Sequence, residues 1–149
     1  MNNKKEISGE IIGKENLDFT SENFIKEPLI FVIFGGAGDL SKKKLLPALY
    51  RLFYNNRLDC QFKIIGTGLP KMSNKQYKEL LTRSIKDHDN DIYDKNKIKS
   101  FQDNLTFQGL NFEKSDDFEK LKKLITSTAD NMQVKTPNVI YYLAAPPQY

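Results

Sequence analysis

The most informative segment of this chain reads Phe31-Val32-Ile33-Phe34-Gly35-Gly36-Ala37-Gly38-Asp39-Leu40-Ser41-Lys42-Lys43-Lys44. An apolar run ends at two glycines, a third glycine follows, and the next residues open a predicted helix that carries three lysines. A buried strand, a glycine turn and a helix N-terminus in this order are typical of α/β proteins that bind a pyrophosphate. Glycine lacks a Cβ, so the backbone can approach a ligand, and the free amides of the turn and the helix start point toward it.

The lysines at 42–44 favour phosphate binding at this turn. Exposed cations early in a helix oppose its macrodipole at a cost of about 0.3–1 kcal/mol each, and a bound phosphate would reverse that sign. The alternatives are a solvated helix face and a glycine turn that binds nothing. The spacing of Gly35, Gly36 and Gly38 matches neither the G-x-G-x-x-G fingerprint nor a Walker P-loop.

A longer string at residues 35–50 closely resembles the coenzyme loop and first helix of glucose-6-phosphate dehydrogenases. In that family the pattern runs G-x-x-G-D-L-x-x-[KR]-K, followed by an apolar pair and proline. Residues 64–68 resemble the end of the family's second strand, and residues 139–147 resemble its fourth strand with a di-proline turn. The resemblance covers the chain from about residue 29 to residue 149.

The resemblance implies a Rossmann-like α/β fold, with a mostly parallel sheet, helices on both faces, and an end after about the fourth strand. It implies the N-terminal coenzyme-binding part of an NADP-dependent oxidoreductase, which converts glucose 6-phosphate to 6-phosphogluconolactone in the pentose phosphate pathway. The family is cytoplasmic and homo-oligomeric at full length. Its catalytic histidine lies beyond residue 149, so we expect this chain alone to be inactive and glucose 6-phosphate to bind only in a full-length form.

The same resemblance implies roles for individual residues. Gly35 and Gly38 would let the backbone pass close to the coenzyme pyrophosphate, and Asp39 would cap the helix. Lys44 would lie between coenzyme and sugar phosphate, binding both, and Pro147 would lie beside the nicotinamide after a cis peptide bond. The expected coenzyme-binding residues are Gly35, Gly36, Ala37, Gly38, Asp39, Leu40, Lys44, Thr67, Leu69, Ala145, Pro146 and Pro147.

One departure from the family pattern bears on the choice of coenzyme. The family usually has an arginine three residues after the glycine that matches Gly66, where it grips the 2′-phosphate of NADP. This chain has Leu69 there, followed by Pro70 and Lys71. No acidic residue, which would favour NAD, ends the second predicted strand. Lys71 can replace the arginine as a point charge without its bidentate geometry, so NADP is the expected coenzyme and NAD the alternative.

Length and composition predict one globular domain. The chain has 149 residues, of which 39% are hydrophobic and 28% charged, enough to build a core. No apolar run approaches the roughly 20 residues of a membrane span. Residues 1–28 form a polar leader without the apolar region of a secretory signal. We expect this leader to be partly disordered and residues 29–149 to form the coenzyme-binding domain.

Other function classes receive weaker support. The net charge of +4 is spread along the chain and interleaved with acids, which is not typical of a nucleic-acid binder. Tyr93 and Lys97 have the Tyr-x-x-x-Lys spacing of short-chain reductases, but they lie in a charged region too early in the chain. A nucleotide-binding module without catalysis remains the main alternative.

The lone cysteine and the lone histidine do not indicate catalysis. Cys60 is predicted to be a small buried hydrophobic residue, and a single cysteine fits a reducing cytoplasm. His88 is interpreted as a solvated helix terminus followed by a charged loop at 87–94, rather than as a general base. No cluster of residues has metal-ligand spacing.

Hydrophobic periodicity predicts strands that alternate with helices, and therefore a parallel sheet. Ser73 and Gln76 form a predicted capping box, and Pro47 falls inside a predicted helix at a cost of about 3 kcal/mol. A strand order 3-2-1-4 would bring the glycine turn and the di-proline turn together. It would also leave residues 139–143 as an apolar edge strand, an aggregation hazard. The predicted strands span 29–34, 62–66, 105–109 and 138–144, and the predicted helices span 39–55, 74–86, 95–101 and, from Ser115 or Asp116, to 128.

Overall fold

The computed structural model describes residues 27–58, 60–134 and 136–146. Their centre is one parallel sheet, as predicted, and its strand order is β3-β2-β1-β4. In register, Leu29 of the central strand lies opposite Phe62 on one side and Asn138 on the other. The strands are β1 (Leu29–Phe34), β2 (Phe62–Gly68), β3 (Leu105–Gly109) and β4 (Asn138–Leu143).

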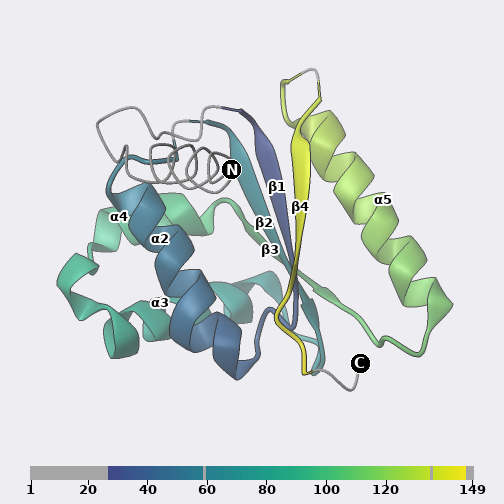
Figure 1. Ribbon diagram of the computed structural model, residues 1–149, viewed down its shortest axis with the longest axis horizontal. Helices are drawn as coiled ribbons and strands as arrows, with labels where there is room; N and C mark the ends of the chain where they lie inside the picture. The colour runs from purple at the N-terminus through teal and green to yellow at the C-terminus, as the bar shows by residue number, and fades with distance from the viewer. Residues whose placement is uncertain (1–26, 59, 135, 147–149) are drawn as a thin grey trace, which may run out of the picture.

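Helices cover both faces of the sheet. Figure 1 shows α2 (Leu46–Tyr54), α3 (Asn74–His88) and α4 (Lys95–Gln102) on one face and α5 (Ser115–Asn131) on the other. This is the arrangement that connections between parallel strands produce, because each crossover helix packs back on the sheet. The parallel sheet expected from the alternating pattern and the Rossmann-like architecture that the resemblance implied are therefore both present (Figure 1).

The central strand β1 divides the interior into two cores. Leu29 and Ile33 belong to the core under α2, α3 and α4, whereas Ile30 and Val32 belong to the core under α5. Successive side chains of a strand point to opposite faces, so a strand covered on both faces must be apolar throughout. All four of these side chains are buried, which explains the unbroken apolar run.

The predicted helix at 39–55 forms, but it is not α-helical throughout. Ser41–Leu45 makes a π-helical turn, η1, and α2 begins only at Leu46. Pro47 consequently lies in the first turn of α2 rather than in its interior. The change of helix type does not by itself remove the cost of the missing N–H.

The π-helical turn also changes which backbone carbonyl lacks a partner. The N–H of Leu46 donates to the carbonyl of Ser41, five residues earlier. At the same spacing the carbonyl of Lys42 would need an N–H from Pro47, which has none. The buried side chain of Ser84, on α3, donates its hydroxyl to the Lys42 carbonyl instead.

The other boundaries differ little from those predicted. The capping box of α3 is present, with Ser73 and Gln76 exchanging hydrogen bonds of 2.8 and 3.1 Å. β2 continues two residues further, to Gly68, and α5 extends to Asn131. The charged loop after α3 contains a 3₁₀ turn, η2 (Asn90–Ile92), because the buried Ile92 draws it onto the core.

β4 is an edge strand of the described sheet. It pairs with β1 alone, and Tyr141 and Leu143 are 57% and 76% exposed. An exposed apolar edge of this kind was expected from the strand order. Among the described helices, none has the length and apolar character that crossing a bilayer requires.

We expect Ser84→Ala to destabilise the fold by about 1–3 kcal/mol, because the Lys42 carbonyl, which is partly buried, loses its donor. Urea unfolding followed by far-UV circular dichroism measures the free energy of unfolding. Ser100→Ala is the matched control, since Ser100 is exposed and its hydroxyl donates to a carbonyl of its own helix, α4. Equal losses in the two variants would contradict the role given to Ser84.

Candidate functional site

The glycine turn after β1 is fixed by hydrogen bonds within the fold. The carbonyl of Thr67, at the end of β2, accepts the amides of Gly35 and Gly36, each at 2.9 Å. The carbonyl of Gly35 accepts the Gly38 amide at 3.0 Å and the Ser41 hydroxyl at 2.7 Å. The amides of Gly35, Gly36 and Gly38 are therefore engaged by carbonyls of the fold.

The amides that can meet an anion lie one turn further on. The helix begins after Gly38, whose carbonyl accepts the amide of Lys42 at 3.0 Å. The amides of Asp39, Leu40 and Ser41 are thus the first of the helix, where no carbonyl of a preceding turn can accept them. Their N–H groups carry the positive end of the helix dipole. This is the common anion site of a helix N-terminus.

Asp39 does not cap the helix as predicted. It lies inside the first turn, because the helix starts one residue earlier than the capping interpretation requires. Its carboxylate lies 3.8 Å from Lys42 Nζ and 3.7 Å from Lys43 Nζ. These pairs are exposed and individually weak, but they balance part of the lysine charge at the helix start.

Tyr77, on α3, contacts the glycine turn and stabilises it. Its hydroxyl donates to the carbonyl of Gly36 at 3.2 Å, and its ring lies against Gly66 of β2. A Cβ at position 66 would lie 2.4 Å from the Tyr77 ring, so the contact requires glycine there. Burial raises the pKa of Tyr77 well above its usual value. The hydroxyl is therefore protonated at neutral pH and can donate to the Gly36 carbonyl.

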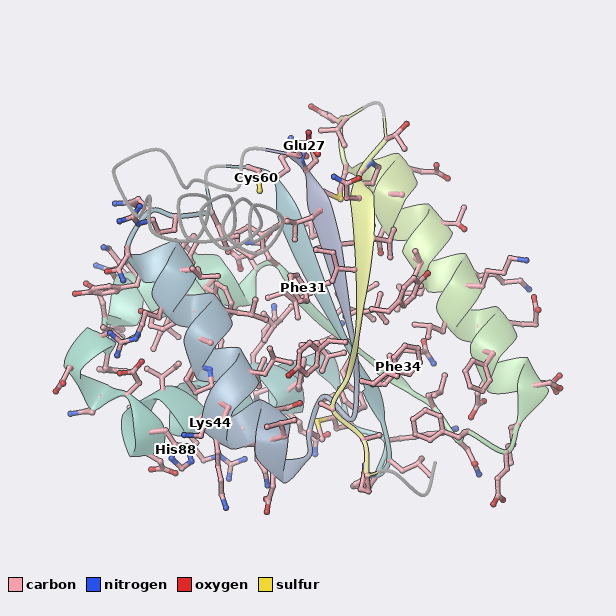
Figure 2. All side chains as sticks on the ribbon, in the orientation of Figure 1. Glu27, Phe31, Phe34, Lys44, Cys60 and His88 are labelled. Atoms are coloured by element: carbon pink, nitrogen blue, oxygen red, sulfur yellow. The ribbon has the colours of Figure 1, made fainter. Side chains whose placement is uncertain are left out.

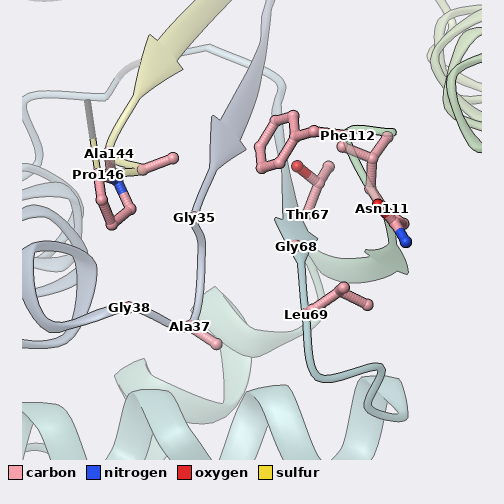
Figure 3. A pocket seen from close by; sticks show the side chains of 12 residues that line it. Gly35, Ala37, Gly38, Thr67, Gly68, Leu69, Asn111, Phe112, Ala144 and Pro146 are labelled. Atoms are coloured by element: carbon pink, nitrogen blue, oxygen red, sulfur yellow. The ribbon is translucent and has the colours of Figure 1, made fainter. Parts of the chain in front are cut away.

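A pocket of about 170 Å³ lies at the carboxyl ends of the strands. Figure 3 shows Ala144 and Pro146 on one side and Asn111 and Phe112 on the other, with Gly35 and Thr67 between them. This edge is where α/β sheets bind their ligands. The residues that line the pocket are Gly35, Ala37, Gly38, Thr67, Gly68, Leu69, Leu110, Asn111, Phe112, Ala144, Ala145 and Pro146.

Gly35 makes the pocket possible by letting two strand ends meet. Its φ is +83°, a left-handed conformation that side chains other than glycine rarely adopt. A Cβ at this position would also lie 2.9 Å from the backbone of Ala144 and Ala145. The site is consequently a cradle of backbone atoms beside a helix N-terminus, which fits an extended ligand with a negatively charged centre.

Seven of the residues predicted to bind a coenzyme line this pocket, namely Gly35, Ala37, Gly38, Thr67, Leu69, Ala145 and Pro146. Gly36 is a buried residue of the turn, and Asp39 and Leu40 lie at the exposed helix start. Lys44 is exposed on η1, and Figure 2 shows it at the end of the sheet opposite to Cys60. Pro147 and its peptide bond lie outside the described residues.

Sequence reasoning missed one wall of the pocket, formed by Leu110, Asn111 and Phe112 after β3. It also missed Gly68 and Ala144, which adjoin predicted residues. The signal available was the strand order, because the carboxyl end of β3 lies beside that of β2 in a 3-2-1-4 sheet. The local sequence carries no motif that marks this wall.

Asp117, at the start of α5, holds the missed wall in place. Its Oδ2 accepts the backbone N–H of Asn111 at 2.9 Å, and its Oδ1 lies 3.3 Å from Lys120 Nζ. The Asn111 hydrogen bond, reinforced by Lys120, lowers the pKa of the buried Asp117 carboxyl below its ordinary value of 3.8. The ionised form is therefore the one that orders this part of the pocket.

Neither the single histidine nor the single cysteine of the chain belongs to the site. His88 is the exposed last residue of α3, as expected. Cys60 is half-buried rather than fully buried and packs against the larger core. Within the described ranges, no group of three or more potential ligands could hold a metal ion.

We expect Asp117→Asn to flatten the dependence of stability on pH in acid. Because the folded-state pKa of Asp117 is lowered, its stabilisation is present above the unfolded value and is lost as pH falls through the folded pKa. Thermal unfolding between pH 7 and pH 2 should show the wild-type and variant curves converging below about pH 4. Asp116→Asn, an exposed neighbour on α5, is the control. If the melting temperature falls equally steeply with decreasing pH in the wild type and in Asp117→Asn, this prediction is wrong.

Comparison with known proteins places the chain in a family. The sequence model of a family described as the NAD binding domain of glucose-6-phosphate dehydrogenase matches residues 32–149. Glucose-6-phosphate 1-dehydrogenase of Schizosaccharomyces pombe is 35% identical over 123 residues, which are 83% of this chain and 24% of that protein. The Kluyveromyces lactis protein of the same name is 33% identical over 121 residues, 81% of this chain and 24% of its own.

A solved structure extends the likeness to three dimensions. It is described as glucose-6-phosphate dehydrogenase in complex with its substrate glucose-6-phosphate, and it superposes with a TM-score of 0.72 at 32% identity. The match covers 87% of this chain and 26% of that one. The chain thus spans about a quarter of the length of the curated relatives it matches. It belongs to the family of glucose-6-phosphate dehydrogenase NAD-binding domains, whose cofactor is a nicotinamide dinucleotide.

Proposed function

We propose that this chain is the coenzyme-binding part of an enzyme that oxidises glucose 6-phosphate to 6-phosphogluconolactone with NADP. One observation carries the proposal. The glycine turn is fixed by Thr67 and Tyr77, and it holds the first amides of a helix beside a backbone-lined pocket. A dinucleotide needs this combination, because its pyrophosphate meets the helix dipole while its two nucleoside halves lie along the strand ends.

The pocket residues would bind and orient the coenzyme. Gly35 would admit the pyrophosphate close to the backbone, and the helix start at Asp39 would face its charge. Ala145 and Pro146, after β4, would lie beside the nicotinamide half and keep water from it. When bound, the coenzyme supplies a hydride acceptor. Lys44, exposed on the first helix, would contact the phosphate of the sugar.

Catalysis would require more than these residues. A general base must remove the hydroxyl proton as the hydride leaves, and the family resemblance assigns that role to a histidine beyond residue 149. We therefore propose that the 149-residue chain binds coenzyme without oxidising the sugar. The family resemblance also supports a cytoplasmic protein that is homo-oligomeric at full length, and the single half-buried Cys60 accords with a reducing compartment.

Gly35→Ala tests the pocket by placing a Cβ against Ala144 and Ala145. We expect the unchanged chain to bind NADP with a Kd below about 1 mM, and the variant to bind at least about tenfold more weakly. Calorimetric titration with NADP and NAD gives both affinities, and addition of glucose 6-phosphate should produce no NADPH absorbance. Ser127→Ala, exposed on α5, is the control. Failure of the unchanged chain to bind either coenzyme would contradict the proposal.

Tyr77→Phe tests the support of the turn more gently, because it removes only the hydroxyl that donates to Gly36 and keeps the buried ring. A net hydrogen bond is worth about 0.5–1.5 kcal/mol, so we expect both coenzymes to bind about 2- to 10-fold more weakly. Tyr93→Phe, an exposed tyrosine after η2, is the matched control. If the free energy of unfolding falls while both affinities stay unchanged, Tyr77 supports the fold alone.

A further inference from the structure

The two edges of the sheet differ in how side chains close them. β3 forms one edge and β4 the other. At the β3 edge, the side chain of Asn74, at the start of α3, accepts the outward backbone N–H of Phe107 at 2.8 Å. A backbone donor that a further strand would use is thereby occupied. Natural proteins commonly protect an edge strand, because an open edge pairs with other chains.

The backbone of β4 remains open at its outer edge. Alternate residues of a strand direct their N–H and C=O groups to opposite sides. The N–H groups of Asn138 and Ala144 donate toward β1 at 2.8 Å each. The odd-numbered residues between them therefore direct their backbone groups outward, where no described residue pairs with them. These residues are Val139, Tyr141 and Leu143.

The side chains of β4 do not block this edge either. Residues 138–143 contain no charged side chain and no proline, which are the usual means of protecting an edge. Beside Tyr141, a groove of about 350 Å³ between β4 and α5 continues the apolar surface to Phe118. The edge is therefore apolar as well as unpaired. Exposed apolar side chains alternate between its two faces, namely Ile140, Tyr141, Tyr142 and Leu143.

A second copy of the same strand fits this edge in a defined register. Two copies related by a twofold axis normal to the sheet run antiparallel, and each contact occurs twice. Outward backbone groups must meet outward groups, and opposite side chains must lie on the same face. Centring the pair on Tyr141 meets both conditions and uses every outward position. Centring it on Ile140 would put Leu143 opposite Pro137, which has no N–H.

The side-chain pairs that this register forms contain no charge. Aromatic and β-branched pairs stabilise antiparallel strands, whereas like charges directly opposite each other destabilise them. A charged residue at the centre of β4 would meet its own charge on the second copy, and β4 has none. The composition of β4 therefore favours pairing with itself. The pairs are Tyr141 with Tyr141, Val139 with Leu143, and Ile140 with Tyr142.

We propose that the 149-residue chain forms a twofold dimer through β4, in which the two sheets join as one. The two α5 helices then lie on the same face, on either side of the seam, and the groove beside each Tyr141 borders that seam. This interface goes beyond the proposed function and does not depend on it, since coenzyme binding plays no part in the pairing.

Sedimentation equilibrium of the 149-residue chain tests the dimer. We expect a reversible change from monomer to dimer as concentration rises, with no larger species, because pairing leaves no β4 edge free. Tyr141→Lys sets two ammonium groups against each other at the axis and should weaken the dimer at least about tenfold. Leu52→Lys, at an exposed leucine of α2, makes the same change of charge elsewhere and should leave the dimer unchanged. Urea unfolding verifies that both variants remain folded.

Disulfide cross-linking tests the register. Directly opposite residues that exchange hydrogen bonds have Cα atoms about 5.5 Å apart, which is within the span of a disulfide. Tyr141→Cys should therefore cross-link to the second copy under mild oxidation. Leu143→Cys should not, because Leu143 lies opposite Val139, although Leu143 is 76% exposed and Tyr141 57%. Peptide mapping distinguishes these bridges from any that involve Cys60.

Each result bears on the interface alone. A monomer at every concentration overturns the proposal, and so do open-ended assemblies. A dimer that Tyr141→Lys leaves intact uses another surface and overturns it as well. Cross-linking of Leu143→Cys as fast as that of Tyr141→Cys contradicts a fixed register. Calorimetric titration with NADP and NAD decides the proposed function separately.

Discussion

Two hydrogen bonds to one carbonyl hold the candidate site together. Thr67 accepts the amides of Gly35 and Gly36, and it does so because the parallel register brings Thr67 opposite Phe34, the last residue of β1. The chain can leave β1 in a left-handed turn only because this carbonyl satisfies its amides. Ser41 then fixes the Gly35 carbonyl from the helix side. The helix start, the pocket and the approach of β4 all depend on that arrangement.

Signals that act over a few residues predicted most of the fold. The apolar run of β1, the Ser73 capping box and the alternation of strands with helices are local patterns, and the resulting sheet has the expected order. The π-helical turn was not predictable in the same way. Pro47 has no N–H to donate to the Lys42 carbonyl. The hydroxyl of Ser84, 42 residues away from Lys42 in the chain, donates to that carbonyl instead, and the turn can tolerate Pro47 for this reason.

The residues of the candidate site also divide into those that local patterns predicted and those that only the tertiary structure brings together. Residues that belong to a motif, such as Ala37 and Pro146, line the pocket. Asn111 and Phe112 belong to no motif, and only the order of strands brings them there. The prediction for Asp39 was wrong for a different reason. An aspartate suits the N-cap position, but the carbonyl of Gly38 already accepts the first helical hydrogen bond, so Gly38 occupies that position. Residue type identifies candidates, whereas the hydrogen-bond pattern assigns their positions.

The two nicotinamide coenzymes would ask for two kinds of charge recognition. A pyrophosphate is common to both nicotinamide coenzymes, and it would be met by backbone amides, which no side-chain substitution can remove. A 2′-phosphate distinguishes the two, and it would have to be met by a side chain. Leu69, an exposed apolar side chain at the end of β2, supplies no charge for a 2′-phosphate. Lys71, two residues after Leu69, lies with its aliphatic stem across Gly109 at the end of β3, so the charged residue nearest to Leu69 along the chain belongs to the loop that follows β2.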